Sequence, residues 1–535
     1  MATADTLVTG ALVRTLDPAR PLASALAVTD GVITAVGEEQ ELKELRGPST
    51  AVHHLAGATV TPGLTDGHTH PLMGVDLATG LDLSGCRDLA ALRAVLAEAA
   101  RTAPRGGWVT GWNLDHNTFG DHPIDRSAID DVLGGVPAFL RLYDAHSALV
   151  SGAALAIAGI DGPRRFAQRA EVVCDADGRP TGHLVEHAAI DLVVPYVPAP
   201  PAAERRSRLL DLLRGMAATG LTTGHVMDLQ SPDALELLAG AEDGADLPVR
   251  LLIHPWCMPG DGDEGVDRLV ALQGRAGRGW RVAGVKFFID GTVEGGTAWL
   301  EHPDCHGQGT EAFWPDPAEY ARALHRLDAA GVATATHAIG DAGVRHVLDT
   351  VEALGVRRAR HRIEHIETVP DAQLPRFAAL GVAASMQPGH CAYTRADHGD
   401  AWSRRLGPER ADRAWRCRDL RDAGATLVLG SDWPISGYDA RAVLAAARLR
   451  RPARAPEVAP VRPEQALTAL MALEGCTTHA ARAAGEEAVA GRIAVGMRAD
   501  LTAFALDPLA APADEVAAAP IRLTMTGGRV VHREE

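Results

Sequence analysis

Short apolar runs alternate with helical stretches through the middle of the chain. The segment 317–331, "PAEYARALHRLDAAG", has the spacing of an amphipathic helix and ends at a glycine suited to a helix C-terminus. Eight apolar runs between such stretches read as strands: 59–70, 220–228, 249–256, 282–291, 331–338, 362–367, 381–388 and 425–434. Eight strands that alternate with helices predict an α/β fold, a (β/α)8 barrel of the TIM type.

The two ends of the chain carry a different pattern. Residues 1–59 and 485–535 alternate apolar and polar positions over short runs, with glycine or Asp-Gly at the turns, as in "ALAVTDGVITAVG". We expect both termini to form one small composite β-sandwich domain, leaving 60–484 to the barrel. Residues from about 75 to 200 are too many for one loop and contain strands of their own, so they predict an inserted subdomain over the barrel mouth.

Length and charge narrow the function classes. The 535 residues exceed the roughly 250–300 at which a single core stops growing, which fits a large domain with additions. A net charge of −17 argues against nucleic acid as a partner, and no apolar run approaches the ~20 residues that cross a bilayer. The first residues lack a signal-peptide pattern, and the seven cysteines include no CxxC pair, so the expected location is the cytoplasm.

Residues that can bind metal ions stand at the carboxyl ends of the predicted strands, where catalytic groups of such barrels lie. In "DGHTH", His68 and His70 are two apart, so an extended strand points both imidazoles to one face. His337, His365 and Asp432 occupy equivalent positions on later strands. Imidazole and carboxylate together suit zinc and similar divalent metals.

Each of these residues also has an ordinary interpretation. The two histidines of "DGHTH" could be polar turn residues, and His337 a hydrogen-bonded core histidine. His361 competes with His365 for the same role, and Asp432 could begin a helix as its N-cap. The convergence of so many such groups on one barrel mouth favours a metal site.

One buried lysine stands out from the composition. Of 52 lysines and arginines only Lys43 and Lys286 are lysine, and Lys286 lies within the apolar run "VKFFIDG". A lysine in an apolar strand has a lowered pKa and can lose its proton, which arginine cannot do. The neutral amine could add carbon dioxide to form a carbamate that bridges two metals. A cation that anchors substrate, a Schiff-base lysine and an exposed lysine are the alternatives.

These motifs together resemble a known family. The order of "TPGLTDGHTH", "VKFFIDGTVEGGTA", "THAIGDAGV", "HRIEH", "ASMQPGH" and "GSDWP" is similar to that of the metal-dependent amidohydrolase superfamily, in the branch with N-substituted formamide deformylase and YtcJ-like proteins (amidohydrolase family 3). The resemblance covers nearly the whole chain. The stretch "TVEGGTA" departs from the Ser-Leu-Gly-like sequence that other members often carry there.

The resemblance implies a barrel flanked by a β-sandwich and a site for one or two divalent ions, expected to be Zn²⁺. His68 and His70 would hold one ion with Asp432, and His337 and His365 a second. A Lys286 carboxylated by carbon dioxide would bridge the two.

The predicted activity is hydrolysis of an amide C–N bond, in an N-substituted formamide or N-acyl amine, by a metal-activated hydroxide. Asp432 is the candidate to carry the water proton to the leaving amine. A cyclic amidase or deaminase on the same scaffold and a non-catalytic binding protein are the alternatives. Lys286 argues against the deaminases, and the intact ligand set argues against a binding protein.

The partner is a small-molecule amide, and a homodimer is left open because dimers are the commonest closed assembly. Candidate substrate-binding residues are Asp290, His390, Trp112, Glu186, His146 and Trp299.

Overall fold

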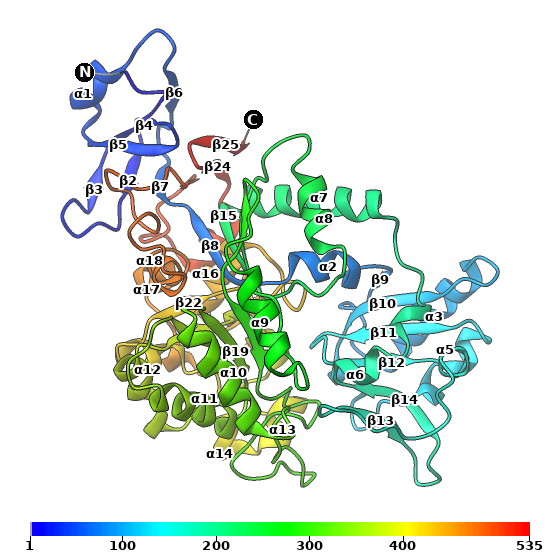
Figure 1. Ribbon diagram of the computed structural model, residues 1–535. Helices are drawn as coiled ribbons and strands as arrows, with labels where there is room; N and C mark the ends of the chain where they lie inside the picture. The colour runs from blue at the N-terminus through cyan, green and yellow to red at the C-terminus, as the bar shows by residue number, and fades with distance from the viewer. Residues whose placement is uncertain (1–2, 535) are drawn as a thin grey trace.

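A computed structural model describes residues 3–534 (Figure 1). The middle of the chain forms two parallel sheets, with strand orders β17-β16-β15-β8 and β18-β19-β20-β21-β22. The strands of the first sheet are β8 (Leu64–Thr69), β15 (Leu221–Val226), β16 (Arg250–Ile253) and β17 (Trp280–Val282). Those of the second are β18 (Val285–Phe288), β19 (Thr334–Ala338), β20 (His361–His365), β21 (Ala383–Met386) and β22 (Leu427–Leu429).

The two parallel sheets meet at both of their edges. One parallel bridge joins Trp256 to Lys286 and another joins Thr69 to Trp433. The arrangement is therefore TIM-barrel-like, and the strands lie inside the helices in Figure 1. These helices are α2 (Pro71–Leu77), α7 (Ala202–Ala218), α8 (Ala234–Ala241), α9 (Gly262–Leu272), α10 (Pro317–Ala329), α11 (Asp341–Ala353), α12 (Leu374–Leu380), α13 (Ala401–Leu406), α14 (Pro408–Ala411), α15 (Cys417–Asp422), α16 (Ala440–Leu449), α17 (Ala469–Gly475) and α18 (Thr478–Ala483).

The apolar run 59–70 is two strands rather than one. It breaks at Gly63, whose backbone N–H donates to the carbonyl of Asp500 at 2.7 Å. A side chain at this position would place its Cβ 2.4 Å from Thr222 Oγ1, so only glycine allows the close approach. The chain passes here from a terminal sheet into the barrel.

Both ends of the chain share one sheet, of order β25-β24-β23-β7-β2-β3, beside a second of order β5-β4-β1-β6. Their strands are β1 (Thr6–Thr9), β2 (Leu12–Arg14), β3 (Leu22–Ala23), β4 (Ala25–Thr29), β5 (Val32–Gly37), β6 (Ala51–His54), β7 (Thr59–Pro62), β23 (Leu501–Phe504), β24 (Ile521–Thr526) and β25 (Arg529–Arg533). The helices of these end segments are α1 (Glu39–Leu42) and α19 (Ala513–Ala518). Val8 and Leu26 of one sheet share a hydrophobic cluster with Leu501 and Met525 of the other.

Residues 81–185 form a further six-stranded sheet, of order β13-β14-β12-β11-β10-β9, which stands beside the barrel in Figure 1. Its strands are β9 (Leu81–Asp82), β10 (Val109–Leu114), β11 (Ala138–Leu142), β12 (Ser147–Val150), β13 (Glu171–Cys174) and β14 (Pro180–Val185). Its helices are α3 (Leu89–Thr102), α4 (Asp130–Leu133), α5 (Gly152–Ile157) and α6 (His187–Ile190). Separate hydrophobic clusters around Leu92 and Leu184 give this region cores of its own. Over residues 3–534, no helix is both long and apolar enough to cross a membrane.

Candidate metal centre

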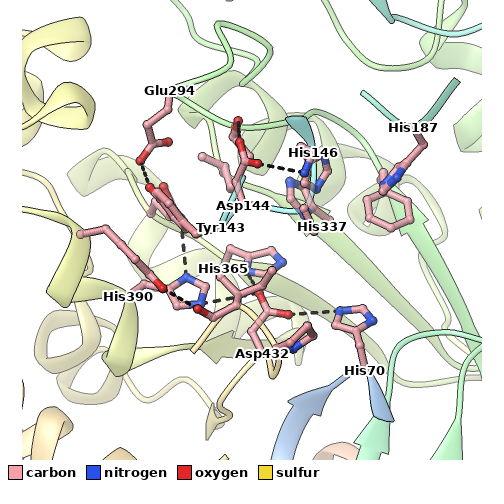
Figure 2. A pocket seen from close by; sticks show the side chains of 18 of the residues that line it. His70, Tyr143, Asp144, His146, His187, Glu294, His337, His365, His390 and Asp432 are labelled. Carbon is pink, nitrogen blue, oxygen red and sulfur yellow. Dashed lines mark hydrogen bonds and ion pairs between the residues drawn. The ribbon is translucent and has the colours of Figure 1, made fainter. Parts of the chain in front are cut away.

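Two histidines at the end of β8 and one aspartate after β22 converge on a single point. His68 Nε2 lies 3.3 Å from His70 Nε2 and 3.4 Å from Asp432 Oδ1, and His70 Nε2 lies 3.1 Å from the same oxygen. Ligands about 2.0–2.1 Å from a tetrahedral ion are separated by about 3.3–3.4 Å. The three atoms therefore have the spacing of three zinc ligands (Figure 2 shows His70 and Asp432).

Backbone hydrogen bonds hold these strand ends together. Asp432 N donates to the carbonyl of His68 at 2.7 Å, and His70 N donates to the carbonyl of Trp433 at 2.9 Å. Asp66 fixes the same junction, because its Oδ2 accepts from Ser431 Oγ at 2.5 Å and its Oδ1 from Ser431 N at 2.9 Å. The ends of β8 and β22 are thus paired where the ligand atoms meet.

A carboxylate lies behind each of the two histidines. His68 Nδ1 is 2.6 Å from Glu364 Oε2, and His70 Nδ1 is 3.3 Å from Asp228 Oδ2. Arg362 in turn donates to both oxygens of Glu364 from Nε (2.5 Å) and Nη2 (3.0 Å). Carboxylates in this position orient metal-binding imidazoles and raise their basicity. Sequence reasoning missed all three residues.

A second group of ligand atoms lies beside the first. His365 packs between His68 and His337, with ring centroids 4.8 Å and 4.5 Å away. Its Nδ1 is buried, has no hydrogen-bond partner in the described chain and lies 3.9 Å from Asp432 Oδ2. His337 Nε2 donates to the carbonyl of Gly291 at 3.0 Å, which leaves Nδ1 as its free ligand atom. The unpartnered imidazole nitrogen fits a ligand for a bound cation.

Two residues of this centre have left-handed backbones, His365 at φ 75° and Asp432 at φ 57°. Such conformations cost non-glycine residues about 1–3 kcal/mol and occur at functional sites, where the surrounding structure holds them. The strain here aims one imidazole and one carboxylate at the same space.

Lys286 is 1% exposed on β18 and enters the same pocket. Burial lowers the pKa of Lys286 to about 8, although Glu364 and Asp432 act in the opposite direction. Its Nζ lies 5.0 Å from the centre of the Phe288 ring, an apolar neighbour. A substantial share of this amine is therefore neutral just above neutral pH.

The pocket in front of these residues has a cavity volume of about 60 Å³. His70, Lys286, His337, His365 and Asp432 line it, while His68 lies behind with 0% exposure. The structure thus brings all six predicted ligands together. Aromatic rings and the carboxyl groups of Asp144, Glu294 and Glu367 also line the pocket, part of which appears in Figure 2.

Two of the six predicted substrate contacts reach the pocket. His390 and His146 both line the pocket, and His390 Nε2 lies 3.6 Å from Asp432 Oδ2. Glu186 is fully buried behind His146, with its Oε2 2.7 Å from His146 Nδ1.

The structure does not bring Asp290, Trp112 or Trp299 to the pocket wall. The Asp290 oxygens accept from the backbone N–H groups of Ile339, Gly340 and Trp299 at 3.0, 2.7 and 2.9 Å, so they bind loops instead. Trp112 lies in β10 of the inserted sheet, and the Trp299 ring packs on His346, 5.2 Å between centroids.

The fold and site define a class of protein, and sequence comparison agrees. The model of an amidohydrolase family, Amidohydro_3, matches residues 51–532, so the chain belongs to this family. It is an enzyme, a hydrolase of the metal-dependent amidohydrolase superfamily.

Particular relatives are similar over nearly their whole length. The putative amidohydrolase YtcJ of Bacillus subtilis is 28% identical, covering 95% of this chain and 96% of that protein. The N-substituted formamide deformylase of Arthrobacter pascens is also 28% identical, with 94% of each chain covered. A crystal structure of an uncharacterized metal-dependent hydrolase from Pyrococcus horikoshii superposes with a TM-score of 0.71 at 22% identity, over 95% of this chain and 99% of that one. This likeness shows that the fold is shared.

Proposed function

We propose that this enzyme hydrolyses the C–N bond of a linear amide, an N-substituted formamide or N-acyl amine. The observation that carries the proposal is the zinc-like spacing of His68, His70 and Asp432 at the bottom of a pocket that also receives Lys286. Similarity to a formamide deformylase over 94% of both chains supports the choice of substrate. We also propose that residues 1–59 and 485–535 form a composite terminal β-sandwich. The barrel would then span 60–484, with its insertion at about 75–200.

The ligand set divides between two ions. His68, His70 and Asp432 would hold one Zn²⁺ or similar ion, and His337 and His365 a second. Lys286 would stand between them as a carbamate, formed when its neutral amine adds carbon dioxide and releases one proton. When bound, such ions supply a hydroxide nucleophile near neutral pH and polarise the substrate carbonyl.

Asp432 is the residue to which we assign the proton transfer. Its Oδ1 faces the two histidines of β8, so Oδ2 remains for the pocket. Burial alone would raise the pKa of Asp432, but the His68 and His70 imidazoles hold it below its ordinary value. An ionised carboxylate can take the proton of the attacking water and pass it to the leaving amine. His390 Nε2 lies 3.6 Å from Oδ2.

Turnover of a substrate panel by the metal-loaded enzyme tests the proposal. Monosubstituted formamides, N-acetyl amines and cyclic amides would be compared by measuring the released amine, with Asp432→Asn as the inactive control. Release from linear amides, absent in the variant, is the expected result. Turnover of cyclic amides alone would overturn the proposal in favour of a cyclic amidase.

A further inference from the structure

A second cavity, of about 390 Å³, lies where the inserted sheet adjoins α2 of the barrel (Figure 1). Residues of β10 and β11 line it together with the segment 194–200, the first turn of α7 and the loop 231–233. Its volume is within the range of about 300–1,000 Å³ that is typical of small-molecule sites.

This cavity is separate from the pocket at the metal centre, and the two share no lining residue. Leu77, the last residue of α2, stands between them. It lines the second cavity and belongs to a hydrophobic cluster with Tyr143 and Ile435, which line the metal pocket. A ligand of the second cavity therefore occupies a site of its own.

The walls of the second cavity are largely apolar, and its charged groups are few. Apolar lining residues include Leu77, Phe139, Val194, Val197, Pro198 and Pro200. The charged lining residues are two arginines and two aspartates: Arg141, Arg205, Asp76 and Asp233. Arg205 is neutralised, because its Nε lies 2.8 Å from Asp76 Oδ1 and its Nη1 lies 2.5 Å from Asp233 Oδ2. The charge of Arg141 is left over.

Arg141 stands on β11 at a position where the strand pattern calls for an apolar side chain. It pairs across the sheet with Ala148 and shares a face with Phe139, two residues before it. Both of these neighbours belong to one buried hydrophobic cluster. The guanidinium of Arg141 lies over the Phe139 ring, 4.9 Å from its centre.

No acidic group satisfies this arginine. Among residues 3–534 its guanidinium forms neither an ion pair nor a hydrogen bond, and it faces the cavity. Burial lowers the pKa of Arg141 to about 10, although the charge of Asp191 acts in the opposite direction, so the group stays protonated at neutral pH. An unpaired charge in apolar surroundings costs stability unless something pairs with it.

We propose that this cavity binds a monocarboxylate with an apolar body, whose two oxygens pair with the Arg141 guanidinium. Arginine and carboxylate match in shape and form two parallel hydrogen bonds. An alkyl or aryl body would cover the apolar walls. A phosphate dianion fits less well, because its second charge would face Asp76 and Asp233 without a free cation.

Calorimetric titration of the zinc-loaded protein with hexanoate tests this site. The wild type should bind hexanoate about 10- to 100-fold more tightly than 1-hexanol, which has the same chain without the charge. Arg141→Met keeps an apolar stem and should remove this preference by weakening hexanoate binding about 10- to 100-fold. In urea it should be at least as stable as the wild type, because it removes an unpaired charge.

A second variant tests the cavity without touching the charge. Val197→Trp places a large side chain on the cavity wall and leaves Arg141 intact, so it should also weaken hexanoate binding by 10-fold or more. Arg93→Met is the matched control. Arg93 lies on α3, its Nη2 is 2.7 Å from Asp131 Oδ2, and it does not line the cavity, so its variant should keep the wild-type Kd.

A metal ion can also bind a carboxylate, so the double variant His68→Asn/His70→Asn is titrated beside the others. It should retain the hexanoate site that Arg141→Met loses. Wild-type hexanoate affinity in folded Arg141→Met or folded Val197→Trp overturns the inference. So does a wild type that binds no hexanoate at millimolar concentration, or binding that only the double variant loses. None of these results depends on amide hydrolysis, so the proposed function stands or falls by its own assay.

Discussion

Glu364→Gln should weaken metal binding at His68 while the barrel stays folded. The carboxylate is fully buried between the guanidinium of Arg362 and His68 Nδ1, 2.6 Å away. Glutamine keeps the shape but removes the charge, so it no longer holds the imidazole in one tautomer. Arg362 retains two other acceptors, the carbonyl of Gly67 and Ser385 Oγ, each at 2.6 Å.

The magnitude of the Glu364→Gln effect has two parts. Loss of a carboxylate behind a metal-binding histidine lowers metal affinity by about 10–100-fold. That corresponds to about 1.4–2.7 kcal/mol. Breaking a buried ion pair costs about 3–5 kcal/mol of stability. Because Arg362 keeps its other acceptors, we expect the free energy of unfolding to fall by no more than the lower end of this range.

Chelator competition gives the apparent zinc Kd, and urea unfolding of the metal-free protein gives the stability. Glu242→Gln is the matched control, because Glu242 is a buried carboxylate that accepts from Arg278 N and Gly279 N at 3.0 and 2.6 Å, away from the pocket. It should lose stability but keep the wild-type Kd. Equal zinc affinity of Glu364→Gln and the wild type would refute the role given to Glu364.

Three other substitutions test separate parts of the account. Lys286→Arg should keep the fold, followed by circular dichroism, but lose bound metal and activity, and full activity would exclude the carbamate. Gly291→Ala puts a Cβ 1.9 Å from Glu186 Oε1 and should lower the free energy of unfolding by about 1–3 kcal/mol in urea, whereas wild-type stability would contradict the packing. His479 accepts from Leu427 N at 3.0 Å, and burial lowers the pKa of His479 to about 4. The stabilisation that His479 provides is full above about pH 6.5 and decreases by up to about 1.4 kcal/mol per pH unit as the pH falls toward 4. The free energy of unfolding of His479→Asn, measured in urea, should therefore depend less on pH between pH 7 and 5 than that of the wild type. An unchanged pH dependence would contradict this.

Much of the metal centre was accessible to sequence reasoning because its geometry follows from strand ends. Parallel strands of a barrel open at one mouth, so His68, Lys286 and Asp432 could be expected to meet although they are far apart in the chain. The structure brings them together, and their roles as ligands remain predictions. Alternation along the strand gave the shared face of the two histidines in "DGHTH".

The carboxylates that support the metal-binding histidines were not predicted, because their contacts depend on how the strands pair across the barrel. Glu364 meets His68 over 296 positions of sequence, and no local pattern encodes that distance. A signal did exist in "HRIEH", where Arg362 and Glu364 alternate with Ile363 within a buried strand and so share one face. Charged residues on the inner face of a barrel strand are worth marking for this reason.

Asp290 shows where strand periodicity stops being informative. It is four residues beyond Lys286, which suggested the same face, but β18 ends at Phe288. Beyond that point the chain turns, and the carboxylate binds backbone N–H groups of neighbouring loops instead of entering the pocket. The departure from strand geometry is set by tertiary contacts that the sequence pattern does not contain.

The central claim is that His68 and His70 hold a catalytic metal ion. Elemental analysis of the zinc-loaded, gel-filtered protein, beside the double variant His68→Asn/His70→Asn, tests it most directly. The account predicts one or two metal equivalents per wild-type chain and the loss of at least one in the folded double variant. A wild type without bound metal, or a double variant with the full complement, would contradict it.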